Sequence, residues 1–89
     1  MNKVFSKMTL VDFALSQLKL PLNEQRPVII HSFSGEALIM ERLKEMGIYP
    51  GLELQVAGRA PFRSPFLFRF GNTVLALRAE EAVCAIVQL

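Results

Sequence analysis

Residues 42–61 read R-L-K-E-M-G-I-Y-P-G-L-E-L-Q-V-A-G-R-A-P, and the backbone is expected to change its regular structure within this stretch. Ile39, Leu43 and Met46 recur at helical spacing, which predicts one apolar stripe of a helix. From Leu52 onward apolar residues occupy alternate positions, which is typical of a half-buried strand. The stretch therefore predicts a helix, a sharp turn and a strand.

Two short signals mark where this helix ends and where the strand begins. Gly47 suits the position just after a helix, because a left-handed backbone closes the last turn there and a Cβ would be unfavourable. Pro50 followed by Gly51 suits the centre of a type II turn, which needs a fixed φ first and a positive φ second. These residues are expected to shape the fold and not to carry out chemistry.

The sequence resembles a known family in two blocks, residues 42–65 and the run V-L-A-L-R-A-E-E-A-V-C-A-I-V from Val74. Both closely resemble the FeoA family, ferrous iron transport protein A, and the resemblance covers roughly residues 15–89. The chain departs from the family at Leu22 and within residues 62–64, where family members usually carry glycine. The resemblance implies an SH3-like fold.

The chain is expected to form one domain at residues 9–89, preceded by a flexible tail at residues 1–8. The predicted strands cover residues 27–33, 52–60, 66–70, 73–77 and 83–89. One helix precedes them and another is inserted between the first two strands. The patterns thus predict a mainly β fold, a small SH3-like barrel of about five strands, in agreement with the fold that the resemblance implies.

Capping residues predict where the two helices begin. Thr9, with Asp12 three residues later, is expected to cap the first helix, and Pro21 is expected to end it. Ser34 is expected to cap the second helix, which covers about residues 36–46.

Prolines and a glycine mark the two remaining turns. Pro61 and Pro65 stiffen the loop after the second predicted strand and cannot donate ladder hydrogen bonds there. Gly71, followed by Asn72, predicts a two-residue hairpin turn of type II′. The loop and the hairpin bracket a strand, residues 66–70, whose three phenylalanines share one face.

Composition and charge narrow the function classes. The 89 residues have a net charge of +2, and the basic residues are scattered singly, unlike the concentrated basic stripe of nucleic-acid-binding proteins. A single cysteine excludes an internal disulfide and fits a reducing compartment. The longest apolar run is residues 82–87, whereas about 20 residues are needed to cross a bilayer. We therefore expect a cytoplasmic protein with no nucleic-acid partner and no direct membrane insertion.

Side chains suited to metal binding or catalysis are scarce. The chain has one histidine, His31, and one cysteine, Cys84, whereas an iron or zinc site needs three or four ligands. His31 is expected to be an ordinary strand residue and Cys84 a small core residue. A nucleophile would need a base and an orienting group, and neither such a set nor a phosphate-binding loop is visible. We expect no enzyme, no cofactor and no metal site.

Protein–protein contact is the remaining class. Arg59, Phe62, Arg63 and Phe66 gather in and beside the proline loop, and arginine and aromatic residues often dominate the energy of interfaces. The phenylalanines of the following strand fill the core in one interpretation and meet a partner in the other. In the first interpretation Phe62 and Arg63 are the exposed candidates.

The resemblance also implies a partner, the ferrous iron permease FeoB, which carries a cytoplasmic GTPase domain. The chain would then be a non-enzymatic accessory protein that stabilises or regulates the permease through protein contacts. An SH3-like regulatory or adaptor module of the iron-dependent repressor type stays open as an alternative, as does a small barrel that binds peptide or nucleic acid. Self-association of the barrel stays open too.

Overall fold

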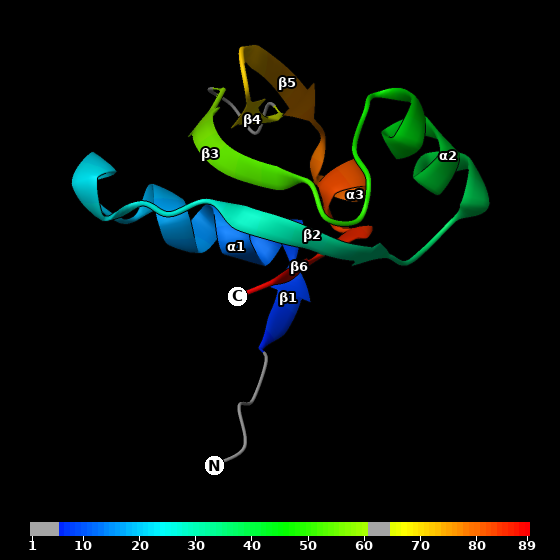
Figure 1. Cartoon of the computed structure of the whole chain (residues 1–89), viewed down its shortest axis with the longest axis horizontal. Coiled ribbons are helices and arrows are strands. Elements are labelled where there is room, and N and C mark those ends of the chain that lie inside the picture. The colour runs from blue at the N-terminus through cyan, green and yellow to red at the C-terminus, as the bar shows by residue number, and fades with distance from the viewer. Residues whose placement is uncertain (1–5, 61–64) are drawn as a thin grey trace.

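The computed structural model describes residues 6–60 and 65–89, and Pro61, Phe62 and Arg63 lie outside them, as do residues 1–5. The described residues form an SH3-like small barrel whose strands make one antiparallel sheet in the order β1-β6-β2-β3-β4-β5 (Figure 1). The strands are β1 (Lys7–Thr9), β2 (Val28–Phe33), β3 (Glu53–Arg59), β4 (Phe66–Phe70), β5 (Thr73–Leu77) and β6 (Ala85–Gln88).

The described residues also form three α-helices and one short 3-10 turn. They are α1 (Leu10–Leu18), α2 (Ala37–Glu45) and α3 (Ala79–Ala82), with a 3-10 turn η1 (Leu22–Glu24) after α1. In Figure 1, α2 stands out beyond the end of β2, and α1 contacts β1, β3 and β6. The N-terminal helix and the helix inserted between β2 and β3 agree with the prediction. None of the helices in the described residues is long and apolar enough to span a membrane.

The N-terminal boundary differs from the expected one. Lys7 and Met8, which the sequence predicts as part of a flexible tail, pair with Gln88 and Val87 of β6 and add a sixth strand. The ladder continues where the N–H of Leu89 donates to the Ser6 carbonyl at 3.0 Å. A three-residue strand has too few positions to show an alternating pattern, so its pairing is decided by the free edge of β6.

The end of α2 has the turn geometry that its sequence predicts. Gly47 has a φ of 91°, and its N–H donates to the Lys44 carbonyl at 3.0 Å. The N–H of Ile48 donates to the Leu43 carbonyl at 3.0 Å, which completes a Schellman motif. Leu43 and Ile48 are both fully buried, so the motif also directs two apolar side chains into the core.

The type II turn that follows is confirmed and is tied to the sheet. Gly51 has a φ of 97°, and the N–H of Leu52 donates to the Tyr49 carbonyl at 3.0 Å. The N–H of Gly51 donates to the Ile30 carbonyl at 2.7 Å, and the N–H of Ile30 donates to the Leu52 carbonyl at 2.9 Å. Both bonds join the turn to Ile30 of β2. They set the register in which β3 begins to pair with β2.

One of the two predicted helix caps is wrong. The Thr9 hydroxyl accepts a hydrogen bond from the Asp12 N–H at 3.1 Å, which confirms the cap of α1. At α2 the N-cap is Glu36 and not Ser34. The N–H of Ser34 donates to the Cys84 carbonyl at 2.8 Å, so this residue prolongs the β2–β6 pairing and lies too early to cap the helix.

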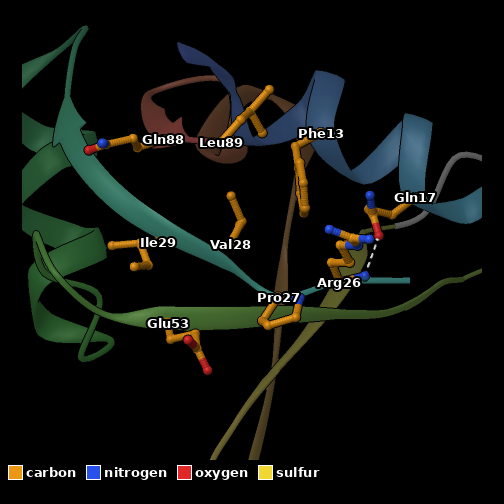
Figure 2. Close-up of a pocket in the computed structure, with 9 residues that line it drawn as sticks. All are labelled: Phe13, Gln17, Arg26, Pro27, Val28, Ile29, Glu53, Gln88 and Leu89. Carbon is orange, nitrogen blue, oxygen red and sulfur yellow. Dashed lines mark hydrogen bonds between the residues drawn. The ribbon is translucent and has the colours of Figure 1, made fainter. Parts of the chain in front are cut away.

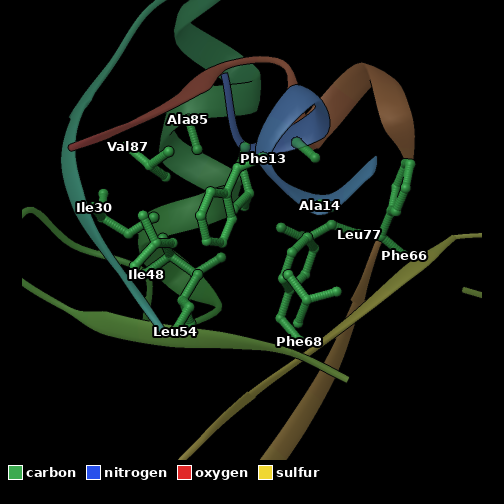
Figure 3. Packing of buried hydrophobic residues seen from close by; sticks show 14 of the residues in the cluster. Phe13, Ala14, Ile30, Ile48, Leu54, Phe66, Phe68, Leu77, Ala85 and Val87 are labelled. Carbon is green, nitrogen blue, oxygen red and sulfur yellow. The ribbon is translucent and has the colours of Figure 1, made fainter. Parts of the chain in front are cut away.

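The phenylalanines of β4 enter the core to different degrees. Phe66 and Phe68 are 2% and 0% exposed (Figure 3). Phe70 packs against the core while staying partly exposed. The strand then turns through Gly71 and Asn72, where Gly71 has the positive φ, 57°, that a two-residue hairpin turn requires. The interpretation in which the phenylalanines of this strand fill the core is therefore confirmed for Phe66 and Phe68.

The junction of β2 and α2 has no room for a side chain at Gly35. Gly35 has a φ of 124°, and a Cβ built there would lie 2.7 Å from the Sγ of Cys84. Cys84 is buried, as expected for a small core residue. This contact explains why a glycine precedes the helix.

Gly35→Ala is expected to lower the free energy of unfolding by about 1–3 kcal/mol, because the new methyl group would overlap the thiol and the φ favours glycine. Removing the sulfur with Cys84→Ala is expected to recover part of that loss, so the double variant should be more stable than the sum of the single effects predicts. Urea denaturation of the four proteins measures this coupling. If the effects of the two single substitutions simply add in the double variant, the contact with Cys84 is not what excludes a side chain at residue 35.

Candidate functional site

An open groove of about 510 Å³ lies where α1, the start of β2 and the end of β6 meet (Figure 2). Its lining residues are Phe13, Gln17, Arg26, Pro27, Val28, Ile29, Glu53, Gln88 and Leu89. They come from four separate parts of the chain, so only the folded barrel creates this surface.

The walls of the groove are apolar. Phe13 lies one helical turn before Gln17 on α1, so both side chains project from the same side of the helix. Phe13 and Val28 are buried, whereas Ile29 and Leu89 are 46% and 52% exposed. The groove therefore keeps apolar surface in contact with solvent, which a partner's apolar side chain could cover.

One polar bond shapes the groove from within. The side chain of Gln17 is only 8% exposed, and its Oε1 accepts a hydrogen bond from the Arg26 N–H at 2.7 Å (Figure 2). A buried amide needs such a partner, and this one holds the connector after η1 against α1. Gln17 is not among the predicted site residues, although a glutamine one turn from Phe13 on an apolar helix face is a signal that the sequence carries.

The rim of the groove is polar and balanced in charge. Arg26 and Glu53 are exposed there and carry opposite charges, and Gln88 adds an amide. An apolar floor with a polar rim is the usual anatomy of a protein-binding surface. The arrangement can bury an apolar side chain and orient it by hydrogen bonds.

Two of the four predicted contact residues lie in the described residues, and the structure brings them together. The guanidinium carbon of Arg59 lies 4.7 Å from the ring centroid of Phe66, within the range of a cation–π contact. Phe66 is 2% exposed, so its assignment to a partner-facing surface is corrected: it shares the inward face of β4 with Phe68. Arg59 is exposed, while Phe62 and Arg63 lie outside the described residues.

The buried carboxylate of Glu81 joins α2 to α3, and this residue is not among the predicted site residues. Glu81 is 6% exposed, its Oε1 accepts from the Arg78 N–H at 3.0 Å, and its Oε2 lies 3.3 Å from the Arg42 Nε. Beside it a shallow groove of about 210 Å³ is bordered by Leu38, which is 79% exposed. The Arg42 guanidinium and the Arg78 N–H stabilise this carboxylate, because its burial without partners would be costly.

In the part of the chain that is described, the side chains considered for metal binding do not gather at one place. There no group of three or more histidine, cysteine, aspartate or glutamate residues could hold a metal ion. His31 is exposed on β2, with its Nδ1 3.0 Å from the Ser32 hydroxyl.

Comparison with known proteins identifies related chains. The family model of the FeoA domain matches residues 14–89. The chain is similar to the solution structure of an FeoA-like protein from Clostridium acetobutylicum, with 30% identity, a TM-score of 0.63, and coverage of 76% of this chain and 83% of that one. It is also similar to a crystal structure described as iron uptake regulatory protein FeoA, with 26% identity, a TM-score of 0.62, and coverage of 79% and 97%.

A third likeness concerns the fold alone. The structure of ScaR with bound Cd²⁺ matches with a TM-score of 0.70 but only 15% identity, over 92% of this chain and 35% of that one. The SH3-like barrel therefore also occurs as a part of a longer protein. No curated protein matches this chain.

Gln17→Ala is expected to lower the free energy of unfolding by about 1–3 kcal/mol, because it leaves the Arg26 N–H without its acceptor. Gln25→Ala is the matched control, because the Gln25 side chain also bonds to the backbone but in an exposed position: its Nε2 donates to the Leu20 carbonyl at 3.1 Å. We expect less than about 0.5 kcal/mol there. Urea denaturation, with hydrogen exchange at the Arg26 amide, measures both. Equal effects in the two variants would contradict a special role for Gln17.

Proposed function

The chain belongs to the FeoA domain family, and on this premise we propose that it is a non-enzymatic accessory protein of ferrous iron uptake. The observation that carries the proposal is the family match over residues 14–89, which includes β2 to β6 and most of α1. A related chain at 26% identity is described as an iron uptake regulatory protein, which supports the same process.

The proposed partner is an FeoB-type ferrous iron permease, bound from its cytoplasmic side, where this chain would reside. In this mechanism the permease handles iron and GTP, and the barrel contributes a shaped surface that stabilises or regulates it. The groove beside α1 supports this role, because its half-exposed Ile29 and Leu89 would be buried by an apolar side chain of the partner. Arg26 and Glu53 at its rim would orient the contact.

Arg59 remains a candidate for a second contact. It is exposed at the end of β3 and is held in place over the Phe66 ring, so its guanidinium is already oriented. Together with Phe62 and Arg63 of the following loop it would form the contact first inferred from the sequence. The two surfaces make separate predictions, because Arg59 does not line the groove.

The test is calorimetric titration of the chain with the cytoplasmic domain of the FeoB-type permease from the same organism. Ile29→Asp is expected to weaken binding at least about tenfold, because it places a charge on the apolar wall of the groove. Val83→Asp is the matched control, since both side chains are 46% exposed and Val83 does not line the groove. It is expected to bind within about twofold of the wild type.

The possible outcomes distinguish whether the chain binds the permease from whether it binds through the groove. If the wild-type chain does not bind the permease domain, the proposed function is wrong. If it binds and both aspartate variants lose equally, the groove is not the contact. A loss confined to Arg59→Glu or to the double variant Phe62→Ala with Arg63→Ala would move the contact to the end of β3 and its loop.

A further inference from the structure

β5 forms one end of the sheet. Among the described residues its strand partner is β4 alone, over the register from Phe66 opposite Leu77 to Phe70 opposite Thr73 (Figure 1). An edge strand presents backbone N–H and C=O groups that no neighbouring strand uses, and these groups are a template for adding another strand.

The hairpin shows which residues of β5 face outward. A two-residue turn makes Phe70 and Thr73 a hydrogen-bonded pair, and hydrogen-bonded pairs alternate along an antiparallel ladder. Leu75, two residues later, therefore also bonds to β4. Val74 and Ala76 direct their backbone groups away from the sheet, and their side chains are exposed.

β5 lacks the features that normally protect such an edge. Thr73–Leu77 contains no charged residue and no proline, and its pairing with β4 continues without a register shift. By contrast, the β2–β6 and β3–β4 ladders are each interrupted by an irregularity. The opposite edge, β1, is three residues long and carries the exposed Lys7. Within the sheet of the described residues, the unprotected edge is therefore β5.

We propose that β5 pairs edge to edge with β5 of a second copy of this chain, antiparallel and centred on Leu75. In this register Val74 lies opposite Ala76 of the other copy, so the outward backbone groups of one strand meet those of the other. Arg78 lies opposite Asn72 of the other copy, so no like charges are placed directly across the pair. The sequence is thus self-complementary about Leu75.

The contact is small and the association is correspondingly weak. One strand pair buries far less than the roughly 1,600 Å² of a standard stable interface, so dimers form at high protein concentration. Its apolar part comes from Val74, which is 52% exposed in the single chain and packs beside Ala76 of the other copy. The proposal does not depend on permease binding.

Sedimentation equilibrium from about 10 μM to about 1 mM tests the association. The apparent mass is expected to rise with concentration from 10.0 kDa toward twice that value. Val74→Lys should lower the association constant at least about tenfold, because a charged lysine on an edge strand disfavours pairing with another strand. The matched control Val83→Lys makes the same change at a side chain 46% exposed and outside β5, and should leave association unchanged.

Cysteine trapping tests the register in a Cys84→Ala background, which removes the native thiol. Leu75→Cys is expected to form an intermolecular disulfide readily, because the two copies of this residue face each other in a non-hydrogen-bonded pair, with Cα atoms about 4.5 Å apart. Val74→Cys, which lies opposite Ala76, should cross-link much less.

A chain that stays monomeric at every concentration overturns the proposal, as does equal cross-linking of the two cysteine variants. If Val74→Lys weakens permease binding while the wild type shows no self-association, the edge belongs to another protein and the proposal is wrong. Concentration-dependent dimers that Val74→Lys abolishes and Val83→Lys preserves support it.

Discussion

The hydrogen bonds that hold the turn after α2 on β2 are the constraint from which the rest of the structure follows. The Ile30 N–H donates to the Leu52 carbonyl and its own carbonyl accepts from the Gly51 N–H, so the turn that joins α2 to β3 is bonded to β2 at two points. Gly47 and Gly51 make this possible, because each adopts a positive φ that other residues avoid. The turn therefore places a helix and a strand at once.

With this turn in place, the sheet buries the side chains of one face in the core and leaves those of the other face exposed. Phe66 and Phe68 fill the barrel with the apolar face of α1, and this packing leaves the groove beside α1 as a hollow at the end of the core. The buried bond between Gln17 and Arg26 keeps the connector at the side of that hollow. The shape of the groove is thus a result of how the barrel closes over its own core.

The groove and the β5 edge use different strands of the sheet, so the two contacts are compatible with each other. The groove is lined from α1, the start of β2, β3 and the end of β6, and none of its lining residues belongs to β4 or β5. The self-pairing edge lies at the β5 end of the strand order. A copy bound to a permease through the groove would therefore keep its β5 edge free for a second copy.

The sequence by itself determined the family, the turns at Gly47, Gly51 and Gly71 and the alternating strands, because these features depend on φ preferences and on residues close together in the chain. Only the tertiary structure decided that Phe66 is buried, that Lys7–Thr9 forms a strand and that Ser34 bonds to Cys84 and does not cap α2. These outcomes, like the groove itself, depend on partners brought together from distant positions, and local patterns carry no information about them.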